Sequence, residues 1–184
     1  RSRGRSVPYN TLERSFMFEP SLRWVGGINP HRLALMPRPR GGEWLREEVE
    51  AWRGAKVEWV VSLLESHEVR ELDLKSEPSL CAEHGIGFWS FPIADRGTPT
   101  STRELSVLLD QLHSEILQGK AVAIHCRAGI GRTGLVAGCL LHLLGVPGKD
   151  IFRVLSRSRG VAVPDTAEQA EWVERYVRAH PKEL

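Results

Sequence analysis

The chain has 184 residues, of which 41% are hydrophobic and 26% are charged, and its formal net charge is +2 at pH 7. A chain of this length can bury the core of one domain without disulfides or metals, and it is too apolar for an intrinsically disordered protein. The charge is too balanced to indicate nucleic-acid binding by the whole domain. The composition therefore predicts one globular domain.

The two ends of the chain have different characters. The first residues, RSRGRS, are basic but lack the apolar core of a secretory signal. We expect residues 1–19 to form a partly flexible basic arm and residues 20–184 to form the domain. The longest apolar stretch, at residues 134–146, contains His142 and is far shorter than the ~20 residues that span a bilayer. It predicts a buried helix and no membrane span.

The three cysteines are Cys81, Cys126 and Cys139, and no two of them form a CxxC pair. Neither a zinc site nor a disulfide framework is indicated, and a reducing, cytoplasmic setting is expected. Cys139 lies among leucines, so we expect it to pack in the core. A reversible disulfide between Cys81 and Cys126 is an open hypothesis.

In the first half of the chain, predicted strands alternate with helices. The segments LRWVGG and RLALM predict a two-stranded opening. In EWLREEVEAWRGA, four residues recur at helical intervals: Trp44, Leu45, Val49 and Trp52. The β-branched run VEWVVSLL predicts a buried strand. A helix is expected at PSLCAEHGI and a strand at IGFWSFPI, whereas the charged stretch SHEVRELDLKSE is assigned no element.

The second half of the chain continues the alternation. A loop of turn formers, ADRGTPTS, leads into the amphipathic helix RELSVLLDQLHSEILQG. AVAIH predicts a short strand and CRAGIGR a loop, and three helices follow, at RTGLVAGCLLHLLG, PGKDIFRVLSRSRG and DTAEQAEWVERYVRAH. The fold class predicted is α/β, a single domain with a central, mostly parallel sheet flanked by helices.

The loop from Cys126 to Arg132 carries the strongest chemical signal. A strand enters it and a helix follows at once, so backbone N–H groups and the positive end of the helix dipole can converge on one anion. Its glycines allow close backbone approach, Arg132 can grip two phosphate oxygens, and the same field favours a thiolate. The residues expected to bind phosphate are Arg127, Ala128, Gly129, Ile130, Gly131 and Arg132.

The residues HCRAGIGRT, from His125 to Thr133, resemble the signature of cysteine-dependent protein phosphatases: His-Cys, five residues, Arg, then Ser or Thr. The resemblance implies a fold like that of protein tyrosine phosphatases, Cys126 as nucleophile and a phosphocysteine intermediate, with no metal or other cofactor. It also implies that Thr133 assists the departing thiolate. His125 would hold the loop in shape, and a plain core histidine is the alternative.

Two more site residues follow from the same resemblance. Family members carry a general-acid Asp on a loop about thirty residues before the Cys, where this chain has Asp95 in FPIADRGTP; by itself it could be a turn residue. Asp73 and Asp110 are poorer candidates for the acid. VPDTAEQ resembles a family segment that positions water, and Gln169 stands where the family has its polar, water-positioning residue. N-capping of a helix by Asp165 or Thr166 is an alternative that is compatible with this role.

The short N-terminal region and PIADRGTP are similar to those of small atypical dual-specificity and cyclin-dependent-kinase-associated phosphatases. This implies a monomeric enzyme whose partners are proteins phosphorylated on tyrosine and on serine or threonine, without nucleic acid.

Other functions remain open. On the same scaffold, the alternative substrate is a phosphoinositide, nucleotide or RNA 5′-phosphate. Lipid-directed relatives tend to carry several basic residues in the loop, and here Arg127 alone is basic at its variable positions. A phosphate-reading module without turnover and a rhodanese-like sulfur transferase fit less well, since Asp95 and the Arg-Thr pair are both present.

Overall fold

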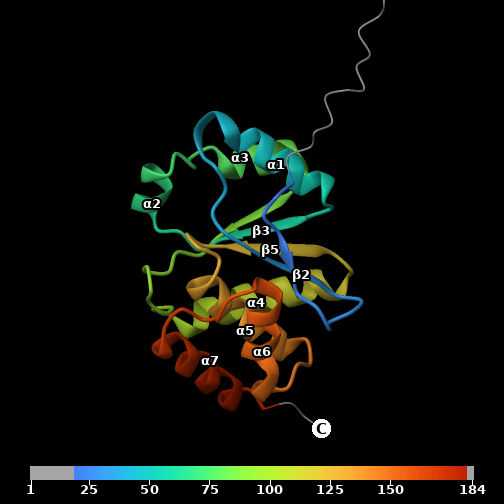
Figure 1. The fold of residues 1–184 in the computed structure, drawn as a ribbon, viewed down its shortest axis with the longest axis vertical. Helices are drawn as coiled ribbons and strands as arrows, with labels where there is room; N and C mark the ends of the chain where they lie inside the picture. Colours follow the sequence, from blue (N-terminus) through green and yellow to red (C-terminus); the bar gives the residue numbers. More distant parts are fainter. Residues whose placement is uncertain (1–18, 182–184) are drawn as a thin grey trace, which may run out of the picture.

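The structure is a computed structural model that describes residues 19–181 of the chain. Of the basic arm expected at residues 1–19, only Glu19 lies in the described part. A central sheet carries helices on both faces (Figure 1). The predicted fold class, an α/β domain with a mostly parallel sheet, is confirmed.

Within the described residues, the sheet has five strands in the order β1-β2-β5-β3-β4. They are β1 (Arg23–Trp24), β2 (Arg32–Met36), β3 (Trp59–Ser62), β4 (Gly87–Ser90) and β5 (Ala121–His125). β1 runs antiparallel to β2, as expected for the opening pair, and the other neighbouring pairs are parallel. Every residue of β5 is buried. β5 is the middle strand of the sheet and ends at His125, so Cys126 directly follows the central strand.

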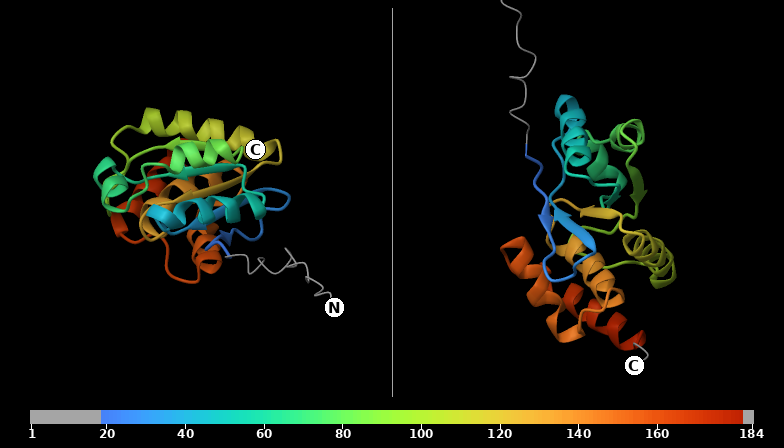
Figure 2. Two further views of the ribbon diagram at one scale, coloured as in Figure 1. Left: turned by 90° about the horizontal axis from the view of Figure 1, so that it is seen from above. Right: turned by 90° about the vertical axis from the view of Figure 1, so that its right-hand side faces the viewer.

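Helices cover both faces of the sheet (Figures 1 and 2), and a separate apolar core lies on each face. On one side are α1 (Leu45–Gly54), α2 (Ser66–Glu71) and α3 (Glu77–Glu83). On the other are α4 (Thr102–Leu117), α5 (Gly131–Leu143), α6 (Ile151–Arg159) and α7 (Ala167–Ala179). Successive strand residues face opposite sides, so Ala123 belongs to the first core whereas Val122 and Ile124 belong to the second.

The apolar face predicted for the first helix is partly wrong. Leu45, Val49 and Trp52 are buried on α1 as expected, but Trp44 is 50% exposed. It lies in a 3-10 turn, Gly42–Trp44, that precedes α1. The tighter winding of a 3-10 turn changes the direction of its side chains, so Trp44 falls outside the buried stripe.

The charged stretch SHEVRELDLKSE, for which the sequence pattern predicts no element, contains α2. Its first turn is closed by the Glu65 backbone N–H, which donates to Glu68 Oε2 at 2.9 Å. Glu68 is 2% exposed, so the buried side of this short helix includes a carboxylate. A helix without an apolar stripe gives no periodic signal, and for this reason the sequence pattern does not reveal it.

α5 is the buried helix that the apolar stretch predicted, and its glycines allow close packing. A Cβ atom at Gly134 would overlap Val163 Cγ1, and one at Gly138 would lie 3.1 Å from Val173 Cγ1. Between residues 19 and 181, no helix is long and apolar enough to cross a membrane.

We expect Gly134→Ala to destabilise the fold by about 1–2 kcal/mol, because the added methyl must displace the stiff Val163 side chain. Helix propensity alone predicts the opposite sign. Gly54→Ala at the end of α1 is the matched control, since a Cβ there meets nothing within 4 Å. Urea denaturation of the two variants measures both effects, and equal midpoints would contradict the close contact.

Candidate active site

The loop that joins β5 to α5 wraps around the sulfur of Cys126. The Gly129 N–H donates to Cys126 Sγ at 3.3 Å, and Cys126 is 3% exposed. Gly129 has φ of 69°, in the left-handed region, and a Cβ atom there would overlap the backbone carbonyl of Met36. Glycine is required at this position for both reasons. The sulfur therefore lies at the base of a loop with an inward-facing N–H group.

The outer side of the loop is fastened by two arginines. At the end of α6, Arg159 donates from Nε to the carbonyl of Gly129 at 3.1 Å and from Nη2 to that of Ala128 at 2.9 Å. The backbone N–H of Arg38 donates to the carbonyl of Arg127 at 3.1 Å. These bonds hold loop carbonyls on the outer side. The anchoring by Arg159 was missed from the sequence, where its SRSRG segment is only a local basic cluster.

Arg132, on the first turn of α5, is 1% exposed, and both of its terminal nitrogens donate hydrogen bonds. Its Nη1 donates to Glu68 Oε2 at 2.6 Å and to the Ile93 carbonyl at 3.0 Å. Its Nη2 donates to Glu68 Oε1 at 2.9 Å and to Asp95 Oδ1 at 2.9 Å. The two-pronged contact with Glu68 fixes the plane of the guanidinium. The apolar pattern does not point to Glu68, because its helix α2 has no apolar stripe.

The charges of this pair stabilise each other in the interior. Burial raises the pKa of Glu68, but the hydrogen bonds and charge of Arg132 outweigh burial, so the net pKa lies below its ordinary value. Burial lowers the pKa of Arg132, whereas Glu68 and the nearby Cys126 sulfur raise it, with a net rise. Both groups are ionised, and a permanent positive charge stands beside Cys126.

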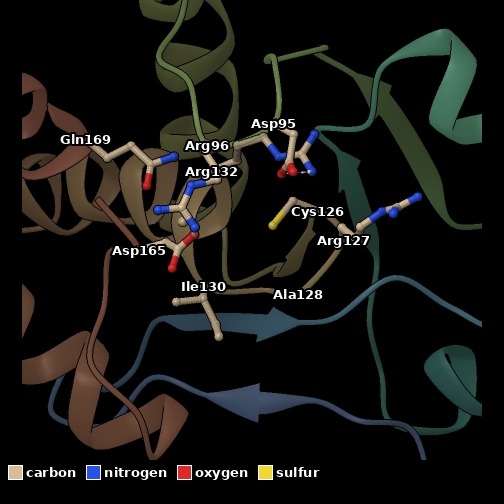
Figure 3. A pocket seen from close by; sticks show the side chains of 10 residues that line it. Asp95, Arg96, Cys126, Arg127, Ala128, Ile130, Arg132, Asp165 and Gln169 are labelled. Atoms are coloured by element: carbon tan, nitrogen blue, oxygen red, sulfur yellow. Dashed lines mark hydrogen bonds and ion pairs between the residues drawn. The ribbon is translucent and has the colours of Figure 1, made fainter. Parts of the chain in front are cut away.

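Asp95 lies on a tight turn after β4. The Gly97 N–H donates to the Ala94 carbonyl at 2.8 Å, and the Asp95 side chain is 60% exposed. Its carboxylate reaches Arg132 and lines the same pocket as Cys126 (Figure 3). Asp73 and Asp110 do not line this pocket.

His125 and Thr133 flank the pocket without lining it. His125 is fully buried, and its Nε2 lies 2.9 Å from Oε1 of Glu77 on α3, close enough for an ion pair but not aligned as a hydrogen bond. Thr133 Oγ1 is buried and has no hydrogen-bond partner among residues 19–181. The Glu77 contact was not expected from the sequence.

Gln169 comes from the first turn of α7 and is fully buried. Its Nε2 donates to the Gly97 carbonyl at 3.0 Å, while Oε1 has no hydrogen-bond partner in the described part of the chain. The Gln169 N–H donates to Thr166 Oγ1, so Thr166 is the N-cap of α7, and Asp165 is not. The capping alternative is therefore correct for Thr166, and the Gln169 side chain also lines the pocket.

The pocket itself has a volume of about 180 Å³. Its lining consists of Asp95, Arg96, Cys126, Arg127, Ala128, Ile130, Gly131, Arg132, Asp165 and Gln169 (Figure 3). Arg96 and Asp165 were not predicted as site residues. The side chain of Arg127 pairs with Glu71 at 2.7 Å. In residues 19–181, no group of His, Cys, Asp and Glu side chains is arranged to hold a metal ion.

Cys81 and Cys139 lie away from this site. Cys81 packs in the core on the α1–α3 side of the sheet, whereas Cys126 belongs to the core on the other side. Burial raises the pKa of the Cys81 thiol to about 12. A disulfide with Cys126 would require Cys81 to leave its core, which argues against that hypothesis. Cys139 is fully buried on α5, as predicted, and burial raises its pKa.

A sulfur at the base of a glycine loop, with a buried arginine behind it and a carboxylate opposite, is the kind of site found in cysteine-dependent phosphatases. The family model described as "Swiss Army Knife protein, DSP-PTPase phosphatase domain" matches residues 20–180. The chain therefore belongs to this family. The prediction of a small atypical dual-specificity phosphatase domain is confirmed.

Individual relatives agree with this assignment. "Putative tyrosine phosphatase 067L" of Invertebrate iridescent virus 3 is 31% identical over 136 residues, which cover 68% of this chain and 52% of the viral protein. The chain thus spans about half the length of that relative.

Solved structures show the same fold. Kinase associated phosphatase has a TM-score of 0.77 at 21% identity, covering 89% of this chain and 99% of that one. Tk-PTP in its active form has a TM-score of 0.69 at 26% identity, covering 88% and 99%. PTPMT1 in complex with PI(5)P has a TM-score of 0.65 at 16% identity, covering 81% and 92%.

We expect Glu68→Gln to destabilise the protein by about 3 kcal/mol at neutral pH, since it breaks a buried ion pair. The folded-state pKa of Glu68 lies below its ordinary value near 4.5. Its stabilisation is therefore complete above about pH 4.5 and is lost as the pH falls through the folded-state pKa. Denaturant titrations of both proteins at several pH values should show the difference shrinking in acid. A difference in unfolding free energy that is constant with pH would contradict the ionised state of Glu68 in its pair with Arg132.

Proposed function

We propose that this protein is a cysteine-dependent phosphomonoester hydrolase with dual specificity, acting on phosphotyrosine and on phosphoserine or phosphothreonine in proteins. The observation that carries the proposal is the convergence of three groups on one small pocket. Cys126 lies at its base, and the Nη2 atom of Arg132 and the Oδ1 atom of Asp95 are 2.9 Å apart beside it.

In the first step, the thiolate of Cys126 attacks phosphorus, so an S–P bond forms while the bond to the leaving oxygen breaks. Arg132 and the inward-facing N–H group of Gly129 hold the other phosphate oxygens as charge develops on them. Asp95 donates its proton to the leaving oxygen. Because Glu68 keeps hold of the guanidinium from behind, Arg132 can exchange its bond with Asp95 for one with the phosphate without turning.

In the second step, water attacks the phosphocysteine, Asp95 takes up a proton from it, and the S–P bond breaks to release phosphate. The unpartnered Oε1 of Gln169 supports its proposed task of accepting a hydrogen bond from this water. The unpartnered Oγ1 of Thr133 supports its task of donating one to the departing thiolate. His125 would hold the loop in shape, and Oε1 of Glu77, 2.9 Å from its Nε2, would fix the position of its ring.

Dual specificity is supported by the walls of the pocket. Among residues 19–181, none of the side chains that line it is aromatic, so the described walls neither clamp the ring of a phosphotyrosine nor require one. The pocket can therefore accept a phosphate from the long side chain of tyrosine and from the shorter side chains of serine and threonine.

A non-protein phosphate is the second candidate, because PTPMT1, which shares the fold, was solved with the phosphoinositide PI(5)P. One observation weighs against a lipid substrate with several phosphates. Arg127, the basic residue at a variable position of the loop, pairs with Glu71 at 2.7 Å and lies 3.6 Å from Glu68. Much of its charge is therefore balanced within the protein.

A substrate panel tests the proposed function. We expect phosphopeptides of both kinds to have kcat/KM values about tenfold or more above those of phosphoinositides in mixed micelles. Phosphate release from every substrate should disappear in Cys126→Ser. If phosphoinositides are turned over faster, the second candidate is correct, and release that survives in Cys126→Ser would rule out the nucleophile.

We expect Asp95→Asn to lower kcat by about 10²–10⁴-fold on an alkyl phosphate, whose leaving oxygen needs a proton. The loss should be much smaller on a nitrophenyl phosphate, and the decline of activity at high pH should vanish. Asp110→Asn, on the exposed side of α4, is the control and should behave as wild type. A variant at Asp95 with an unchanged pH profile on the alkyl phosphate would show that another group is the acid.

A further inference from the structure

Arg96 and Asp165 meet across the mouth of the pocket (Figure 3). Arg96 directly follows Asp95 on the turn after β4, and Asp165 directly precedes Thr166, the N-cap of α7. Arg96 Nη1 lies 3.2 Å from Asp165 Oδ2. The pair thus joins the turn that carries Asp95 to the opposite wall.

A second contact joins the same two segments deeper in the molecule. Gln169, in the first turn of α7, donates from its buried Nε2 to the carbonyl of Gly97 at 3.0 Å. Two successive residues of the turn from Ala94 to Gly97, Arg96 and Gly97, therefore contact side chains at the start of α7. Neither contact involves Arg132.

The backbone of Arg96 is in a conformation that most residues avoid. Its φ is 57°, in the left-handed region, where glycine is free of the strain that a Cβ atom introduces. A glycine would suit the turn better, but it would leave Asp165 without its partner. The side chain at this position must therefore be explained by its contact and not by the turn.

The proposed reaction creates a need for such a contact. Before substrate binds, the bond to Arg132 holds Asp95 in place. Once the phosphate takes that place on Arg132, and Asp95 carries the proton it will donate, the attraction between these two side chains is lost. The Asp95 side chain is 60% exposed, so packing alone does not restrain it.

We propose that Arg96 and Asp165 are a pair of positioning residues that latch the Asp95 turn over the bound phosphate. This inference rests on the proposed role of Asp95 as general acid. The latch acts when the bond between Asp95 and Arg132 has been exchanged for substrate, and it keeps the carboxyl group near the leaving oxygen. Its effect falls on the chemical step and not on substrate binding.

The test is a double-mutant cycle with Arg96→Gly and Asp165→Asn, measured on alkyl and nitrophenyl phosphates. An exposed ion pair contributes little, so we expect each single change to lower kcat about threefold on the alkyl phosphate. KM should stay the same, and the nitrophenyl phosphate should show almost no loss. The double variant should be no slower than either single variant, because both changes remove one contact.

Two controls separate this role from a structural one. Arg96→Gly relieves backbone strain, so its thermal midpoint should be equal to or above that of wild type while its kcat falls. Arg46→Gln removes a comparable exposed ion pair, with Glu83 at 3.0 Å, that does not line the pocket, and kcat should not change.

Each remaining outcome is decisive. Losses of kcat that multiply in the double variant, or that are equal on both substrates, would overturn the latch. Neither result would contradict the proposed phosphatase function. Absence of any Cys126-dependent phosphate release would instead overturn the proposed function, so the two failures are distinguishable.

Discussion

The ion pair between Arg132 and Glu68 is the interaction on which the rest of the site depends. Both side chains are almost completely buried, and the two oxygens of one meet the two terminal nitrogens of the other. An unpaired guanidinium could not stay at this depth, because the cost of removing a charge from water exceeds what packing returns. With Glu68 behind it, Arg132 presents its remaining N–H groups to the pocket and to the Ile93 carbonyl.

The site is assembled from segments that are far apart in the sequence, and glycines let them approach. Gly129 lies against the carbonyl of Met36 at the end of β2, and Gly131 lies against the Gln169 side chain on α7. The N-terminus of α5 is thus enclosed by the end of β2 on one side and by α7 on the other. A side chain at Gly129 would push the loop away from β2, and a side chain at Gly131 would push α5 away from Gln169 on α7.

Apart from α2, the order of elements and the position of the pocket could be predicted from the sequence, because apolar periodicity and the loop from Cys126 to Arg132 are local patterns. Glu68 and the contact between His125 and Glu77 could not. Each joins residues from separate helices, and a buried carboxylate looks in the sequence like any solvent-exposed one. Trp44 shows the opposite error, since an apolar residue in helical phase lies outside the helix.

The packing of the cysteines has a consequence for redox chemistry. Cys139 lies eight residues into α5, roughly 12 Å along the helix axis from its first residue, and Cys81 is in the core beyond the sheet. All the cysteines of the chain lie in the described part. A sulfenic acid formed on Cys126 would therefore find no resolving thiol in its own fold. Reduction of this sulfenic acid would therefore require a thiol from another molecule, small enough to enter the phosphate pocket.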